Sequence, residues 1–279
     1  MNVGAGEPGE APRHPREWDA GTYHRVSTPQ QAWGRRVLDR LVLRVGEHVL
    51  DAGCGTGRVT LSLLEKLRST GAAGGRIVAI DRSVEMTRIA RRTLPTEVPV
   101  VAADVLALPF RRAFDLVFST ATFHWVLDPA ALYRAVARVL RPSGRLHAQC
   151  GGAGNLAGFP ARVDALASSP RFAARFENWT DPWVFLAPEE AERHLRAAGF
   201  STVRAWLEPE PTPFASREDY RVFIEHVVLW ARMARLAGAP AEATAFLDTL
   251  CDAAASDDPP FNLAYVRLNL EAAMPQEAA

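Results

Sequence analysis

The apolar positions of the chain first follow a helical period and then alternate between short buried runs and amphipathic stretches. A helix is predicted over Trp18–Leu43, where apolar residues such as Trp33, Val37 and Leu41 recur close to one helix face. Strands are predicted at His48–Asp51, Arg76–Ile80, Val98–Ala103, Phe114–Phe118 and Arg145–Cys150. Helices are predicted between them at Val59–Leu67, Ser83–Leu94 and Pro129–Leu140. This alternation predicts βαβ units and a doubly wound, mostly parallel sheet.

The pattern changes after Gly151, where strands become sparse. Helices are predicted at Pro160–Phe176 and from Pro188 to Gly199, strands at Thr202–Leu207 and Phe261–Leu270, and a helical block at Ser216–Ala255. Because the block separates two strands, we expect it to be an insertion that caps a site on the sheet.

Composition narrows the class of protein. The chain has 279 residues, 48% of them apolar, and 32 acidic residues balance 32 basic ones. A net charge of zero argues against a broad nucleic-acid or anionic-membrane surface. Three widely spaced cysteines indicate neither a disulfide framework nor a zinc site. Without a signal-like or membrane-spanning apolar run, a cytoplasmic location is expected.

The sharpest motif is Asp51-Ala-Gly-Cys-Gly-Thr-Gly57, which lies where a strand meets a helix. Glycines there allow positive φ angles and a close approach of the backbone to a ligand. Asp81 follows the second strand, where a carboxylate can accept the hydroxyls of a ribose. Asp104 follows the third strand and can accept the exocyclic amine of adenine. Taken alone, each feature has a structural alternative: the glycines as a tight turn, Asp81 as the cap of the next helix, and Asp104 as a turn residue.

A nicotinamide dinucleotide is the competing cofactor. Its fingerprint is G-x-G-x-x-G, whereas Gly53, Gly55 and Gly57 are spaced G-x-G-x-G and Asp51 opens the turn. A cofactor without phosphate but with a charged amino-acid tail suits this turn better.

These motifs resemble class I S-adenosylmethionine-dependent methyltransferases over about Trp18–Cys150. The 51–57 turn is similar to their first motif, Asp81 and Asp104 to their acidic positions, and Phe118–Trp125 to their fourth segment. Trp18–Tyr23 and Phe123–Trp125 further resemble trans-aconitate and malonyl-carrier methyltransferase-like small-molecule enzymes. The resemblance implies a seven-stranded sheet whose last strand is antiparallel.

The pattern along the chain, together with the resemblance, implies a domain organisation. It predicts a disordered lead-in at 1–16, an S-adenosylmethionine-binding Rossmann-like domain at 17–150, the rest of the sheet with connecting helices at 151–208, a helical substrate cap at 209–260, and the last strand and tail at 261–279.

Cofactor contacts are carried over residue by residue. The three glycines would line the methionine tail of S-adenosylmethionine, and of its product S-adenosylhomocysteine, with Asp51 opening the turn. The remaining contacts would be Asp81 to the ribose, Asp104 and the Val105 amide to adenine, the Arg82 stem over adenine, the Ser119 carbonyl to the methionyl amine, and Tyr23 to the carboxylate end.

On the acceptor side, His124 is the candidate catalytic residue, as a base or as a group that orients an acceptor hydroxyl. The alternative is that it only packs beside Trp125, which is itself either pocket wall or core. Gln31 is a candidate donor to an acceptor carboxylate, or a surface residue. Tyr220 belongs to an apolar helix face that either lines the pocket or packs as core.

The prediction is methyl transfer to an oxygen or carbon of a small organic molecule, such as a carboxylic acid or secondary metabolite. The alternatives are a non-catalytic cofactor-binding module and a nicotinamide-dependent oxidoreductase. A nucleic-acid methyltransferase is disfavoured because the fourth segment lacks an Asn/Asp-Pro-Pro-aromatic motif and no basic patch is evident. No metal site is predicted, since the acids between Asp248 and Asp258 lack the Gly and Glu of a calcium loop. The sequence leaves the acceptor's identity and the oligomeric state open.

Overall fold

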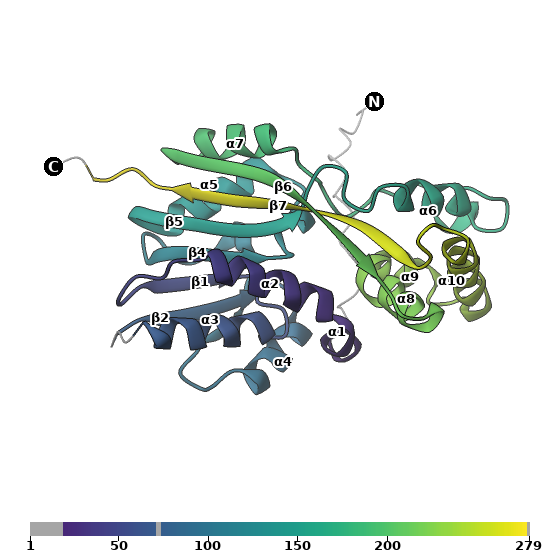
Figure 1. The fold of residues 1–279 in the computed structure, drawn as a ribbon, viewed down its shortest axis with the longest axis horizontal. Coiled ribbons are helices and arrows are strands. Elements are labelled where there is room, and N and C mark those ends of the chain that lie inside the picture. The colour runs from purple at the N-terminus through teal and green to yellow at the C-terminus, as the bar shows by residue number, and fades with distance from the viewer. Residues whose placement is uncertain (1–18, 71–73, 278–279) are drawn as a thin grey trace, which may run out of the picture.

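The computed structural model describes residues 19–70 and 74–277. It centres on a seven-stranded sheet with the order β3-β2-β1-β4-β5-β7-β6 (Figure 1). The strands are β1 His48–Ala52, β2 Arg76–Asp81, β3 Val100–Ala102, β4 Phe114–Thr120, β5 Leu140–Gly151, β6 Thr202–Pro213 and β7 Asn262–Ala273. The pairings among β1 to β5 are parallel, and β7 runs antiparallel to both β5 and β6. The predicted α/β fold class is confirmed.

Helices cover both faces of the sheet. They are α1 Ala20–Val26, α2 Thr28–Arg40, α3 Arg58–Ser69, α4 Val84–Thr93, α5 Pro129–Val139, α6 Phe159–Ala167, α7 Pro188–Ala197, α8 Arg217–Phe223, α9 Trp230–Leu236 and α10 Pro240–Ala255. Successive strand residues point to opposite faces. Leu116 and Phe118 of β4 accordingly belong to the cluster of α2, α3 and α4, whereas Val117 belongs to that of α5 and α7.

Local sequence explains several boundaries. The Ser83 hydroxyl accepts a hydrogen bond from the Met86 N–H and starts α4, as predicted. The helix predicted over Trp18–Leu43 is instead two helices that meet at Ser27, because Pro29 has no N–H with which to continue one helix through Ser27 and lies instead in the first turn of α2. Trp18 and the predicted lead-in, residues 1–16, lie outside the described residues.

Two strands, β5 and β6, are much longer than predicted. β5 begins at Leu140 and contains the expected turn at residues 141–144 as an irregularity, where the register jumps from Phe114↔Leu140 to Leu116↔Arg145. β6 continues to Pro213, since it pairs with β7 along its whole length. The first residues of the interval predicted as cap, 209–213, are therefore strand.

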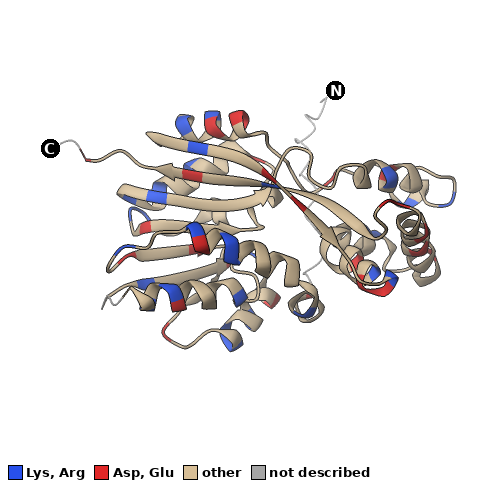
Figure 2. Cartoon of the chain, in the orientation of Figure 1, with Lys and Arg blue, Asp and Glu red and all other residues tan. Residues whose placement is uncertain are grey.

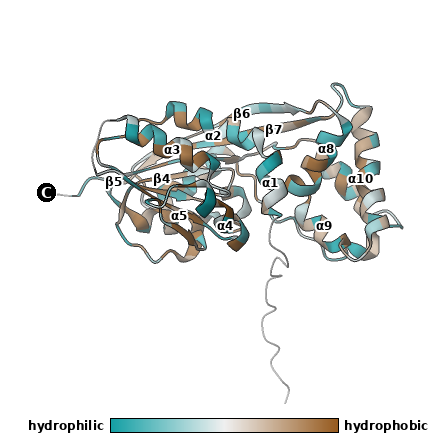
Figure 3. Ribbon diagram, turned by 90° about the horizontal axis from the view of Figure 1, so that it is seen from below, coloured by the Kyte–Doolittle hydropathy of each residue, from teal (hydrophilic) through white to brown (hydrophobic). Residues whose placement is uncertain are grey.

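The cap lies beyond the carboxyl ends of the parallel strands, where Figures 1 and 3 both show α8, α9 and α10. A π-helical turn, Ile224–Val228, joins α8 to α9. The cap has a core of its own, in which Phe223 of α8 and Phe246 of α10 pack together with Tyr265 of β7. Because β6 and β7 both reach into it, the cap is continuous with the sheet.

Charged residues of both signs are interspersed over the helices, the sheet and the cap (Figure 2). Many pair across elements, as Arg141 does with Asp115 at 2.7 Å. Within the described ranges, no helix is both long and apolar enough to cross a bilayer. The same residues contain no group of three or more His, Cys, Asp or Glu that could hold a metal ion.

Candidate functional site

The glycine turn after β1 forms the floor of the site. Gly53, Gly55 and Gly57 have φ angles of +88°, +54° and +84°, which disfavour any residue with a Cβ. A Cβ on Gly53 would lie 2.1 Å from Oγ1 of Thr122, whereas one on Gly55 would meet nothing within 4 Å and project into open space. Gly53 and Gly55 line a cavity, and Gly57 instead forms the N-cap of α3.

Asp81 joins this turn to the next one. Its Oδ2 accepts a hydrogen bond from the Gly55 N–H at 2.8 Å, and its Oδ1 accepts one from the Ser83 N–H at 2.9 Å. A carboxylate oxygen can accept more than one hydrogen bond, so Asp81 keeps capacity for ligand hydroxyls. The backbone donors also fix the carboxylate in place at the rim of the cavity.

The cavity has a volume of about 750 Å³ and extends from the glycine turn past β2 and β3 to the cap. Arg82, Asp104 and Val105 line its far side together with Asp81. Oδ1 of Asp104 accepts a hydrogen bond from the Leu106 N–H at 2.8 Å and so begins the short helix η1 Val105–Ala107. The space suits a nucleoside-sized ligand. The protein offers it one carboxylate acceptor at the sugar end, Asp81, and another at the base end, Asp104.

Asp51 and Ser119 lie behind this wall. Asp51 is 2% exposed, accepts a 2.6 Å hydrogen bond from Oγ1 of Thr60, and borders a small side cavity rather than the main one. Burial raises the pKa of its carboxyl to about 7. The Ser119 hydroxyl donates to the Ala52 carbonyl at 2.6 Å inside the sheet, and the next residues, Thr120 and Ala121, line the cavity in its place.

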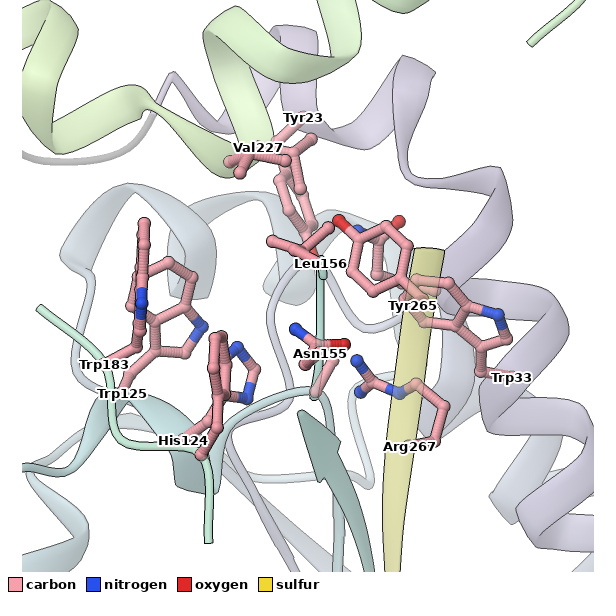
Figure 4. A pocket seen from close by; sticks show the side chains of 14 residues that line it. Tyr23, Trp33, His124, Trp125, Asn155, Leu156, Trp183, Val227, Tyr265 and Arg267 are labelled. Atoms are coloured by element: carbon pink, nitrogen blue, oxygen red, sulfur yellow. The ribbon is translucent and has the colours of Figure 1, made fainter. Parts of the chain in front are cut away.

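A smaller inner pocket adjoins the main cavity (Figure 4). Tyr23, Ala121 and Trp125 line both spaces, so the two lie side by side. His124 and Arg267 also line the inner pocket, His124 from the short helix η2 Phe123–Trp125 and Arg267 from β7. The structure therefore brings the candidate residues Tyr23, His124 and Trp125 together, beside a residue that the sequence did not indicate.

Among the described residues, Glu210 is the carboxylate that acts electrostatically on the buried guanidinium of Arg267, and it does so from beyond ion-pair distance. Arg267 is 1% exposed, and no carboxylate among the described residues lies within ion-pair distance of it. Its Nε and Nη2 atoms have no hydrogen-bond partner. The guanidinium carbon lies 4.4 Å from the ring centroid of Trp33 and 5.9 Å from that of Tyr265. Burial lowers the pKa of the Arg267 guanidinium.

His124 lies in the same environment. Nδ1 of its ring accepts a hydrogen bond from the backbone N–H of Gly151 at 3.3 Å. Burial, and secondarily the charge of Arg267, holds the pKa of the imidazole well below its usual range. The ring is therefore neutral at neutral pH.

Two further predicted residues lie away from the inner pocket. Oε1 of Gln31 accepts a hydrogen bond from Arg58, and the pair borders the side cavity near Asp51. Tyr220 is 1% exposed in the cap core, where its ring packs against Phe214 and Phe261. Its spacing on the helix face indicated burial correctly, but the side that it faces is core and not the cavity.

Aromatic residues that the sequence did not single out complete the wall. The ring of Trp125 lies 5.7 Å from that of Trp183 and 6.1 Å from that of Trp230, and Trp183 stacks on Phe185 at 5.9 Å. Trp183 and Phe185 come from the segment before α7, which contains no recognisable motif. Their aromatic character was the one signal available in the sequence.

Comparisons with known proteins agree with this architecture. Residues 50–148 match the model of the methyltransferase domain family. A trans-aconitate 2-methyltransferase of Methylobacterium nodulans is 33% identical over 192 residues, 68% of this chain and 67% of that protein. An uncharacterised methyltransferase of Schizosaccharomyces pombe is 27% identical over 218 residues, 75% of this chain and 79% of that protein. The chain spans about half the length of other trans-aconitate 2-methyltransferases that it matches.

A solved structure extends the likeness in fold. Phosphoethanolamine N-methyltransferase 2 of Haemonchus contortus, in complex with phosphomonomethylethanolamine and S-adenosylhomocysteine, has a TM-score of 0.57 and 16% identity, and the match covers 92% of this chain and 57% of that one. Fold and family together define an enzyme of the transferase class. The chain belongs to the S-adenosylmethionine-dependent methyltransferases. The predicted family and enzyme class are confirmed, and the nicotinamide-dependent alternative is excluded.

Proposed function

We propose that this chain transfers a methyl group from S-adenosylmethionine to an oxygen of a small organic acid. The observation that carries the proposal is Arg267, a guanidinium that is 1% exposed, faces the inner pocket and has no carboxylate partner among the described residues. Burying an unpaired charge is costly, and an anionic acceptor would offset that cost when it binds. One relative is named for trans-aconitate, which is itself an acid.

The predicted cofactor residues fit this role with some changes. Gly53 and Gly55 leave room for the methionine tail, and Asp81 has acceptor capacity for the ribose hydroxyls. Asp104 and the Val105 amide would hold adenine, Arg82 would cover it, and Tyr23 would lie at the junction toward the acceptor. Asp51 and Gly57 would act through the shape of the turn. Backbone atoms of Thr120 and Ala121 would replace the contact first assigned to Ser119.

The bound cofactor supplies a methyl group that its sulfonium already activates. The task of the chain is to orient the acceptor and exclude water, which contributes roughly 7–11 kcal/mol to a reaction when the geometry is right. Trp125, Trp183 and Trp230 would form the walls of the acceptor path. An amine acceptor is less well supported, because none of the described residues that line the inner pocket is Asp or Glu, and Arg267 would repel a cation.

The test is a turnover screen with purified protein, S-adenosylmethionine and three matched panels: carboxylic acids, phenols and amines. Release of S-adenosylhomocysteine and the mass of the methylated product are measured together. We expect turnover with acids, and an Arg267→Met variant that raises the KM for them. Turnover with amines alone would contradict the acid assignment. Tight cofactor binding with no turnover in any panel would support the non-catalytic alternative.

A further inference from the structure

The inner pocket holds three donor side chains on one wall, His124, Asn155 and Arg267. We propose that these residues form an anion-binding site in which His124 donates a hydrogen bond and does not act as a base, so that the acceptor must arrive already ionised. The link to turnover rests on the proposed function, whereas the anion site can be tested by binding alone.

The orientation of His124 follows from its backbone contact. Because the Gly151 N–H donates to Nδ1, that nitrogen carries a lone pair, and the proton of the neutral ring is on Nε2. Nε2 has no hydrogen-bond partner in the part of the chain that the structure describes. A neutral imidazole with its one acceptor nitrogen occupied offers only an N–H to a ligand. It can orient an anion, but it has no free lone pair with which to remove a proton.

The orientation of the Asn155 side-chain amide is likewise fixed by a hydrogen bond from the backbone. Asn155 is 5% exposed, and its Oδ1 accepts a hydrogen bond from the Val266 N–H at 2.9 Å. This contact assigns the other atom of the amide, Nδ2, as the donor that remains. Figure 4 shows Asn155 between His124 and Arg267 on the wall of the pocket. Strand pairing explains the arrangement, since Gly151 of β5 is opposite Arg267 of β7.

No other group around His124 can serve as a base near neutral pH. Burial raises the pKa of both Tyr23 of α1 and Tyr265 of β7, which therefore stay protonated. Burial also raises the pKa of Cys150 of β5 to about 11. The aromatic neighbours have no basic nitrogen, and Gln30 adds only a neutral amide. Within the ranges that the structure describes, no Asp, Glu or Lys lines the inner pocket.

The acceptor class follows from these contacts. Carboxylic acids are ionised at neutral pH, whereas phenols and alcohols must lose a proton during the reaction. Ester formation joins a carboxylate oxygen to the methyl carbon while the carbon–sulfur bond breaks, its electron pair goes to sulfur, and no proton is released. We therefore expect methyl esters of carboxylic acids to be the products.

The anion site is tested by calorimetry with acetate, benzoate and trans-aconitate, each against its neutral amide. At least one carboxylate should bind more tightly than its amide by about tenfold or more, as expected for hydrogen bonds to a charged group. His124→Gln keeps an N–H donor without a basic nitrogen and should bind within about threefold of the unmodified protein. His124→Phe keeps the ring without the donor and should bind about tenfold more weakly.

Asn155→Asp is the complementary variant. It keeps the acceptor for the Val266 N–H but replaces the donor with a carboxylate oxygen beside Arg267, and it should abolish the preference for carboxylates. Thermal unfolding of each variant verifies folding. A pocket that binds amides as well as carboxylates, or an Asn155→Asp variant that retains the preference, would overturn the proposal.

Turnover separates this inference from the proposed function. With an acid that is methylated, His124→Gln and His124→Phe should both raise KM more than they lower kcat, since each alters a binding contact and neither removes a base. A general base would instead lose about 100-fold or more in His124→Gln. If carboxylates bind as expected but no acid is methylated, the proposed function fails and the anion site stands. If acids are methylated but His124→Gln is inactive, the role given to His124 fails.

Discussion

Replacing Arg267 with Met should stabilise the protein and remove its affinity for acids at the same time. A buried charge without a partner costs several kcal/mol even after relaxation, and Met removes that cost while keeping much of the side-chain volume. The lost contacts with the rings of Trp33 at 4.4 Å and Tyr265 at 5.9 Å take back about 1–2 kcal/mol each. The net gain should be about 1–2 kcal/mol, which corresponds to a Tm higher by about 2–8 °C in a chain of this size.

Arg232 in α9 provides the matched control. It is nearly as buried, at 3% exposure, but it pairs with Asp164 and, at 3.0 Å, with Asp181. Arg232→Met leaves both carboxylates without their partner and should lower the free energy of unfolding by about 1–3 kcal/mol, a figure discounted because Asp164 is 56% exposed. Differential scanning calorimetry of both variants should give Tm shifts of opposite sign. If Arg267→Met is destabilised as much as Arg232→Met, then Arg267 is a structural residue and not one reserved for a ligand.

Three further predictions concern the cofactor half of the site. Asp81→Ala should weaken S-adenosylmethionine binding by about 10-fold or more in calorimetry, because each hydrogen bond to a charged acceptor contributes about 1.5–3 kcal/mol; unchanged affinity would remove Asp81 from the site. Gly53→Ala should abolish binding or folding, since its Cβ would lie 2.1 Å from Oγ1 of Thr122, and a stable variant with full affinity would contradict this. The pKa of Asp51 is about 7 in the fold against an ordinary 3.8, so the contribution of Asp51 to the free energy of unfolding should be greatest below pH 4 and be lost as the pH rises to about 7. Asp51→Asn should flatten the pH dependence of the free energy of unfolding, which urea titrations measure and whose slope from Asp51 is up to about 1.4 kcal/mol per pH unit. An identical pH dependence in the variant would show that another group is responsible.

The cofactor half of the fold was predictable because its signals are local. The 51–57 turn directly follows a strand, and Asp81 and Asp104 each lie within a residue or two of a strand end. In a parallel sheet such ends meet at one edge, so short motifs suffice to predict a shared cavity. The boundaries that differed, at Ser27 and within β5 and β6, depend on a proline or on pairing with a distant strand.

The acceptor half was not predictable in the same way. Asn155 and Arg267 line one pocket because Asn155 follows β5, which pairs with β7 in one register, and the two residues are far apart in the sequence. The available signal was a charged residue within the apolar alternation of the last strand. Tyr220 shows the opposite difficulty, since helical spacing predicts burial without telling a cavity from a core. Gln31 was a reasonable candidate whose acceptor oxygen is occupied by Arg58.

The unpaired guanidinium has a consequence for the end of the catalytic cycle. On the proposed function, the carboxyl group that reacts enters as an anion and leaves as an ester group without charge. The charge of Arg267 attracts the carboxylate of the acid but has no comparable attraction for the ester group. Once the ester has formed, the Arg267 guanidinium is again buried without an anion beside it. Methylation thus removes the main attraction between the ligand and the pocket. The ester should therefore bind the pocket far more weakly than its parent acid and should be a poor product inhibitor. The residue that selects the substrate therefore also favours release of the product.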